Sequence, residues 1–168
     1  MIDNNFTVTT TVDATPEEAF AAINNVRGWW NETIEGTTGT VGDSYRFEVP
    51  GAHRCTMTTT DSVPGLRLVW HVTDAHLSFI ADPAEWEDTE VVFDLADNDG
   101  RTEIRFTHVG LRPTDECYEV CANAWGGYIT KSLHDLITTG TGDPFRLDST
   151  FETELHKHGN TALIKPRP

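Results

Sequence analysis

Lysine and long apolar runs are scarce in this chain of 168 residues. Lys131, Lys157 and Lys165 are its only lysines, and the formal net charge is −15. Nucleic-acid recognition depends on Lys and Arg side chains that release counterions from phosphates, so nucleic acid is excluded as an expected partner. No segment approaches the ~20 apolar residues that a transmembrane helix needs. We therefore expect a soluble protein without membrane insertion.

Cysteines and the motifs of cofactor enzymes are also sparse. Cys55, Cys117 and Cys121 are odd in number and form no CxxC pair, which disfavours a disulfide framework. Cys117, Cys121 and His134 lack the spacing of a zinc site, so no metal is expected. GxGxxG, the P-loop, GxSxG and HExxH do not occur, which predicts no cofactor and no standard hydrolase chemistry. The start of the chain lacks the pattern of a secretion signal, which predicts a cytoplasmic protein.

The first thirty residues predict a strand followed by two short helices. Apolar residues alternate with threonines over residues 6–12, which indicates a β-strand. Thr15, Pro16 and Glu18 have the spacing of a capping box with proline at the first helical position. The second helix is expected to end in the tryptophan pair 29–30. This pair could cap a cavity mouth or form an interaction surface, but we favour burial of one ring and partial exposure of the other.

Residues 35–74 predict successive antiparallel strands, because glycine-bearing turns separate runs of β-forming residues. Each run has one apolar face. The residues expected on these faces are Tyr45, Phe47 and Val49, then Cys55 and Met57, then Leu66, Leu68, Trp70 and Val72. Residues 74–88 are less periodic, and Pro83 with its acidic neighbours predicts a solvated loop.

Residues 90–111 predict a hairpin that turns at Gly100, a residue able to take a positive φ. Its inner face is expected to carry Val91, Phe93 and Leu95 on one strand and Thr102, Ile104, Phe106 and His108 on the other. Residues 114–138 then predict one long helix that stops at Gly140. Gly126 and Gly127 cost roughly 1 kcal/mol each inside a helix, so we expect a close contact or a bend there.

Three blocks of this sequence resemble a known superfamily. The segments ATPEEAF followed by WW, EVVFDLADNDGRTEIRFTHVGL and CANAWGGYITKSLHDLITTGTGDP are similar to the SRPBCC (START/Bet v 1-like) superfamily, and within it to the group related to the activator of Hsp90 ATPase. The similarity covers about residues 5–144. It implies an α+β helix-grip fold, in which a curved seven-stranded antiparallel sheet wraps around a long C-terminal helix, with two short helices after the first strand. It also implies a domain at residues 1–144 and a C-terminal extension at 145–168 whose role is open.

A helix laid across a bent sheet leaves room for a ligand, and the resemblance implies a hydrophobic cavity there. The candidate cavity residues are Tyr45, Phe47, Met57, Trp70, Phe93, Phe106, His108, Trp125 and Tyr128. Core packing is the alternative for each of them. His108 could orient a ligand or act as a general base, but we favour a core histidine bonded to a backbone carbonyl.

We expect the chain to bind a small hydrophobic molecule, such as a lipid, polyketide or aromatic compound, without catalysis. One alternative is an enzyme of the cyclase or hydratase kind that uses a cavity histidine and tyrosine as acid and base. Another, implied by the resemblance alone, is a module that interacts with an Hsp90-type chaperone. A homodimer is left open. A fold shared by carriers, cyclases and receptors does not choose among these functions.

Overall fold

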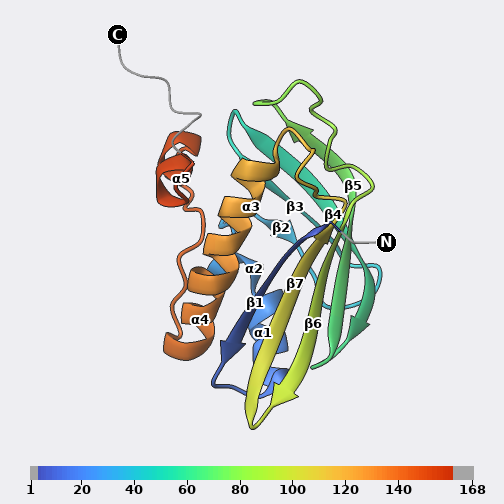
Figure 1. The fold of residues 1–168 in the computed structure, drawn as a ribbon, viewed down its shortest axis with the longest axis vertical. Helices are drawn as coiled ribbons and strands as arrows, with labels where there is room; N and C mark the ends of the chain where they lie inside the picture. The colour runs from blue at the N-terminus through green and yellow to red at the C-terminus, as the bar shows by residue number, and fades with distance from the viewer. Residues whose placement is uncertain (1–3, 161–168) are drawn as a thin grey trace.

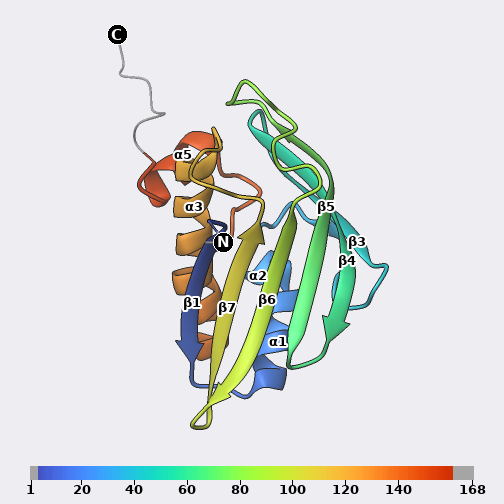
Figure 2. The ribbon, with the colours of Figure 1, turned by 45° about the vertical axis from the view of Figure 1, so that its right-hand side comes forward.

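The computed structural model describes residues 4–160 and shows a single curved sheet with every described helix on its concave side (Figures 1 and 2). The strands are β1 (Phe6–Val12), β2 (Glu35–Gly36), β3 (Ser44–Val49), β4 (His53–Val63), β5 (Arg67–Leu77), β6 (Glu90–Asn98) and β7 (Arg101–Val109). The helices are α1 (Pro16–Asn24), α2 (Val26–Trp29), α3 (Tyr118–Gly127), the π-helical segment η1 (Tyr128–Leu133), α4 (His134–Thr139) and α5 (Phe151–Lys157). Within these residues, no helix is both long enough and apolar enough to span a bilayer.

The sheet has seven antiparallel strands in the order β1-β7-β6-β5-β4-β3-β2, which confirms the predicted helix-grip fold. Its register brings the inward residues of neighbouring strands side by side. Phe93 on β6 is paired with Phe106 on β7 and with Leu68 on β5, and all three side chains are fully buried. The central strands therefore form one continuous apolar floor beneath the helices.

Strand β5 continues through residues for which the sequence predicts the start of a loop. A bulge in the pairing of β4 with β5 places Met57 opposite Val72 but Thr56 opposite Asp74, so Thr73 is an extra residue. The inward positions consequently change from even to odd numbers along β5, and a simple alternation no longer fits. The prediction for Leu66 is also wrong, because it precedes the strand and is 58% exposed.

The capping signals around α1 are confirmed. The backbone N–H of Glu18 donates to the Thr15 hydroxyl across 3.1 Å, and Pro16 occupies the first helical position. At the other end of the chain, the long helix ends as predicted at Gly140, which has a φ of +87°. Glycine takes this left-handed conformation without the steric cost of a Cβ atom.

The long helix begins later than residue 114, at Tyr118. Glu85, in the connection between β5 and β6, accepts hydrogen bonds from the backbone N–H groups of Glu116 and Cys117 at 3.1 and 2.9 Å. A distant carboxylate thus satisfies N–H groups at the start of the helix. The Glu116 carboxylate in turn accepts two backbone N–H groups of the same connection. This acidic segment, predicted to be a solvated loop, is therefore fastened to α3.

The long helix is also interrupted at its centre by η1, where the hydrogen-bond pattern widens. Single π-turns inside α-helices occur frequently at functional sites. The expected close contact is present at Gly127, where a Cβ atom would lie 2.4 Å from Nδ1 of His158. A Cβ atom at Gly126 would meet nothing within 4 Å. Gly127 therefore lets the C-terminal segment approach the helix.

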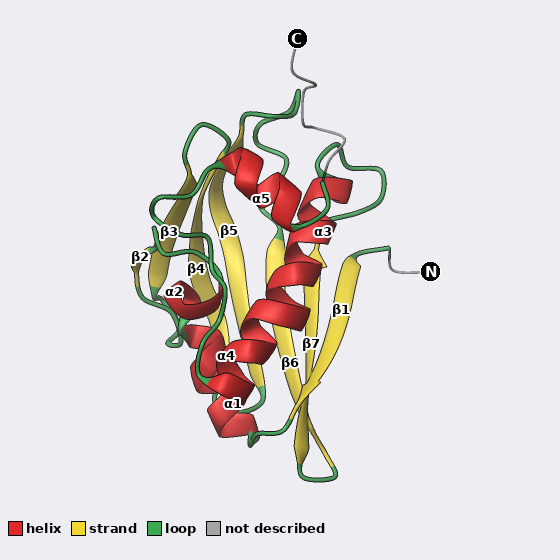
Figure 3. Ribbon diagram, turned by 90° about the vertical axis from the view of Figure 1, so that its left-hand side faces the viewer, coloured by secondary structure: helices red, strands yellow, loops and turns green. Residues whose placement is uncertain are grey.

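Residues 145–160, which fall within the predicted extension, pack onto the same core. Phe145 is buried, and its backbone exchanges hydrogen bonds of 2.8 and 2.9 Å with Trp30 and Glu32. Helix α5 follows and crosses the concave side of the sheet next to α3 (Figure 3). Residues 1–3 of the predicted domain and residues 161–168 of the predicted extension lie outside the described residues. The boundary at residue 144 stays a prediction.

Candidate functional site

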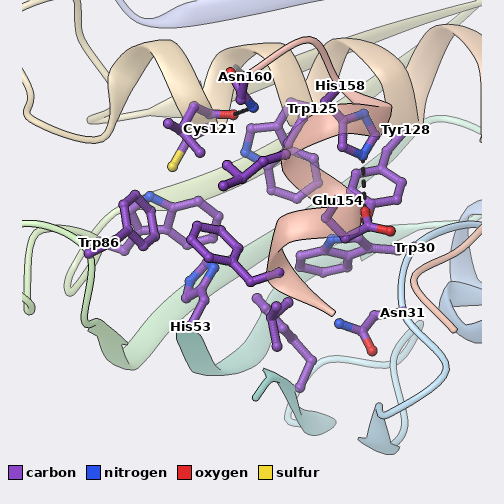
Figure 4. A pocket seen from close by; sticks show the side chains of 17 residues that line it. Trp30, Asn31, His53, Trp86, Cys121, Trp125, Tyr128, Glu154, His158 and Asn160 are labelled. Atoms are coloured by element: carbon purple, nitrogen blue, oxygen red, sulfur yellow. Dashed lines mark hydrogen bonds and ion pairs between the residues drawn. The ribbon is translucent and has the colours of Figure 1, made fainter. Parts of the chain in front are cut away.

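A small cavity lies where α3, the N-terminal part of the long helix, and α5 meet one end of the sheet. Its volume is about 80 Å³. The sheet and its connections supply Trp30, Asn31, Phe47, Val49, His53, Phe79 and Trp86. The long helix supplies Val120, Cys121, Ala124, Trp125 and Tyr128, and the C-terminal segment supplies Phe151, Glu154, Leu155, His158 and Asn160. Figure 4 shows aromatic rings on several sides of this space, with polar groups of the C-terminal segment among them.

The predicted cavity residues fall into two groups. Phe47, Trp125 and Tyr128 line the cavity. The others do not line it and are buried in the core behind it, namely Tyr45, Met57, Trp70, Phe93, Phe106 and His108. Ligand contact by any of these residues stays a prediction.

Trp30 explains why two of these core residues, Trp70 and Tyr45, do not reach the cavity. Its ring stacks on Trp70, with 5.9 Å between the ring centroids and 9° between the planes, and it meets the edge of Tyr45 at 6.2 Å. Trp30 therefore fills the concave centre of the sheet and presents its other side to the cavity. Trp29 and Trp30 are both buried, so the prediction that one of them is partly exposed is wrong.

His108 is a fully buried core residue with both ring nitrogens engaged. The Trp125 indole N–H donates to Nδ1 across 3.1 Å, which leaves the ring proton on Nε2. Nε2 lies 2.9 Å from the Thr89 hydroxyl, which itself donates to the Trp86 carbonyl. Burial lowers the pKa of His108 to about 3, so the ring is neutral near pH 7. His108 is buried as the core interpretation expects, but its partners are side chains and not a backbone carbonyl.

A polar cluster around Glu154 ties α5 to the long helix. The Tyr128 hydroxyl donates to the Glu154 carboxylate, and His158 Nε2 and Lys157 Nζ lie 3.1 and 3.7 Å from it. Burial alone would raise the pKa of Glu154, but the hydrogen bonds from His158 and Tyr128 outweigh burial and lower the pKa. Burial and the adjacent carboxylate raise the pKa of Tyr128. The cluster thus contains an ionised carboxylate and a neutral phenol at physiological pH.

His53 forms a second polar feature of the cavity. Its Nε2 atom is buried and has no hydrogen-bond partner among residues 4–160. The imidazole packs edge-to-face against Trp86 and Phe47, with ring centroids 4.5 and 5.0 Å away. Burial lowers the pKa of His53 to about 3, which keeps the ring neutral. A rigid, neutral and unsatisfied hydrogen-bonding group therefore borders an apolar space.

The three thiols are buried and free. Cys117 interacts with the thiol of Cys121, and this contact together with burial raises the pKa of Cys117. Burial likewise raises the pKa of Cys55. A thiol whose pKa is raised is a poor nucleophile at neutral pH. Within the described ranges, no group of three or more His, Cys, Asp or Glu side chains has an arrangement suited to a metal ion.

The sequence matches the family model of the activator of Hsp90 ATPase homolog 1-like proteins over residues 13–138. The chain belongs to this family. The matched region ends before the C-terminal segment, so Glu154, Leu155 and His158 lie outside it. In this chain, residues C-terminal to the matched region complete the cavity wall.

Solved structures show the same fold. The Aha1 dimer from Colwellia psychrerythraea has a TM-score of 0.68 and 26% identity, and the match covers 84% of this chain and all of that chain. DynU16, from the dynemicin biosynthetic locus, has a TM-score of 0.63 and 16% identity, covering 84% of this chain and 49% of that one. CalU16 from Micromonospora echinospora has a TM-score of 0.57 and 12% identity, covering 93% and 84%. A comparison with the curated proteins finds no significant match.

Proposed function

We propose that this chain binds a small, mostly apolar molecule in the cavity bounded by β3, β4, α3 and α5. The observation that carries the proposal is the aromatic-walled space in which His53 Nε2 is buried without a partner among residues 4–160. Ligand sites typically combine apolar walls with a few polar groups that fix the ligand's orientation. The helix-grip fold, with its helix laid across a curved sheet, fits such a binding domain.

The size of the cavity requires one wall to move. Sites for drug-sized ligands occupy roughly 300–1,000 Å³, and a cavity of about 150 Å³ holds benzene. The present space of about 80 Å³ is smaller than either. Helix α5 is the wall best placed to yield, because it is short and follows residues 146–150, which form no helix or strand. We therefore propose that α5 moves away from α3 when a ring-sized ligand binds.

The enzyme alternative depends on His108 as the acid or base. His108 does not line the cavity, and its two ring nitrogens already contact Trp125 and Thr89. Proton transfer from or to a ligand requires hydrogen-bond reach, directly or through one water. His108 is therefore better explained as a core residue than as an acid or base, and this geometry favours binding over catalysis.

A homodimer is proposed on a different basis. The Colwellia protein at 26% identity was solved as an Aha1 dimer, and the match covers all of that chain. Sedimentation equilibrium on this protein should show a mass that rises towards twice the monomer mass with concentration. A constant monomer mass up to about 0.5 mM would contradict the dimer. An interaction with a chaperone is carried by the family's name alone.

The binding proposal is tested by filling the cavity. Ala124 lines the cavity, whereas Ala122 lies on the same helix but borders a separate groove beside β1. The protein should be titrated with small neutral aromatic compounds while the indole N–H signals of Trp30, Trp86 and Trp125 are followed by NMR. Saturable shifts are expected in the wild type and in Ala122→Leu, with at least about tenfold weaker binding in Ala124→Leu. Equal binding by both variants would place the ligand elsewhere, and no binding by the wild type would contradict the proposal.

A further inference from the structure

The polar atoms around the cavity differ in how well their hydrogen bonds are satisfied. Glu154, Tyr128 and His158 satisfy one another. Asn160 accepts a hydrogen bond from Asn123 at 2.8 Å and donates to a backbone carbonyl. His53 Nε2 and Trp86 Nε1 have no hydrogen-bond partner within the described part of the chain.

The two unsatisfied atoms are not equivalent. The indole Nε1 of Trp86 can only donate a hydrogen bond, whereas an imidazole nitrogen donates or accepts according to the ring tautomer. The His53 imidazole borders the cavity and packs against the rings of Phe47 and Trp86. Figure 4 shows His53 and Trp86 beside the same space. His53 Nε2 is thus the cavity atom with the largest unmet hydrogen-bonding capacity.

An unmet buried group of this kind destabilises a folded protein. Leaving a buried donor or acceptor without a partner costs the full desolvation of that group, and native structures keep few of them. A strained or unmet polar group commonly marks a place where a ligand or an ordered water belongs. Since the edge-to-face packing on Trp86 and Phe47 holds the imidazole in one orientation, a ligand need not order it.

The charge around His53 selects against ions. The imidazole is neutral because burial lowers its pKa to about 3. A ligand carboxylate or phosphate would therefore gain no ion pair from it, and would lose its hydration on entering aromatic surroundings. The Glu154 carboxylate lies in another wall of the same cavity and would repel an anion. A cation would find that carboxylate already contacted by Lys157 and His158.

On the premise of the proposed function, we propose that the ligand is a neutral molecule with an apolar, ring-sized body and one hydroxyl or similar group that hydrogen-bonds to His53 Nε2. A hydroxyl can both donate and accept, so it satisfies His53 in either ring tautomer. His53 is then the residue that determines specificity. Hydrocarbons fill the same space but leave His53 Nε2 without a hydrogen-bond partner. Acids bring a negative charge for which the neutral imidazole offers no ion pair.

Three probes with the same ring separate these cases: p-cresol, toluene and p-toluate. Binding is measured by the tryptophan indole signals and by the ¹⁵N shift of the His53 ring. In the wild type p-cresol should bind at least about tenfold more tightly than toluene, and p-toluate should bind most weakly. In His53→Leu, p-cresol and toluene should bind alike. His76→Leu, an exposed histidine of β5, should behave as the wild type.

Each result decides a different claim. Toluene binding as tightly as p-cresol to the wild type, or p-toluate binding most tightly, overturns the role of His53 while the cavity remains a binding site. Binding of none of the three probes to the wild type overturns the proposed function as well. If His53→Leu does not fold, the wild-type His53 ring decides, because its Nε2 shift should change with p-cresol and not with toluene. An unchanged Nε2 shift at saturating p-cresol would show that Nε2 binds only water.

Discussion

The indole N–H of Trp125 donates a hydrogen bond to Nδ1 of His108 across 3.1 Å, and this contact joins the long helix to β7 in the centre of the core. Protonation of His108 would place a proton on Nδ1 and break the bond. The contact therefore couples the protonation state of one buried ring to the packing of helix on sheet.

Acidic pH should destabilise the protein through His108. Its pKa is about 3 in the folded state and ~6.5 in an unfolded chain, so the unfolded state binds more protons between these values. The contribution is fully present above pH ~6.5, and the free energy of unfolding should fall by about 1 kcal/mol per pH unit for this histidine below it. Urea denaturation between pH 7 and pH 4.5 measures the total slope, to which His53, whose pKa is also about 3, adds a similar share.

His108→Gln should flatten the slope by about that amount, because glutamine keeps a hydrogen-bond acceptor but does not titrate. His76→Gln, at an exposed position of β5, should retain the wild-type slope. Identical slopes for the wild type and His108→Gln would show that this histidine does not control the acid response.

The long helix offers a matched pair of glycines. Gly126→Ala should raise the free energy of unfolding by up to about 1 kcal/mol, since a Cβ atom there meets nothing within 4 Å. Gly127→Ala places its Cβ atom 2.4 Å from His158 Nδ1, so the His158 ring must shift, and this cost offsets the gain in helix propensity. Thermal unfolding of both variants should rank Gly126→Ala above Gly127→Ala. The opposite order would mean that the His158 ring does not pack closely on Gly127.

Glu154→Gln should loosen α5. The substitution removes the charge that Lys157 and His158 contact and weakens the bond from Tyr128. We expect a loss of about 1–2 kcal/mol in the free energy of unfolding, faster amide hydrogen exchange in α5 and faster association of p-cresol. Glu152→Gln, exposed on the same helix, is the control and should change none of these. Slower or unchanged association in Glu154→Gln would argue against α5 as the moving wall.

Glu85→Ala tests the contact between the acidic connection and the long helix. Removal of the carboxylate leaves the N–H groups of Glu116 and Cys117 without this acceptor. Loss of a capping side chain costs about 0.5–2 kcal/mol, so the free energy of unfolding should fall by that amount. Glu87→Ala, an exposed neighbour, should have little effect. Equal effects of the two substitutions would mean that Glu85 acts only through its negative charge and not through its two hydrogen bonds to the helix start.

Local patterns predicted much of the fold and less of the site. Alternation, turn residues and the Thr15 cap involve neighbours in sequence, and these predictions are confirmed except at Leu66 and beyond the bulge in β5. The bulge at Thr73 and the capping by Glu85 depend on the partner strand and on a helix about thirty residues away, so periodicity alone does not reveal them.

The position of the cavity depends on Trp30 and α5, whose packing is not visible in local sequence patterns. Trp30 occupies the space in front of Trp70, which moves the cavity away from the predicted core residues. The sequence held weak signals for α5, since Thr150 has the character of an N-cap and Glu154 and His158 are four residues apart on the helix that follows. Nothing in that spacing shows which part of the chain they contact.

The most direct test of the central claim is native mass spectrometry of the protein purified from its own host, with Ala124→Leu and Ala122→Leu prepared in the same way. If the cavity binds a small neutral molecule, the wild type and Ala122→Leu should carry an additional mass that is depleted in Ala124→Leu. If the wild type has only the mass of the chain and also shows no indole shifts with p-cresol or toluene, or if all three proteins carry the same additional mass, the cavity is not the ligand site that we propose.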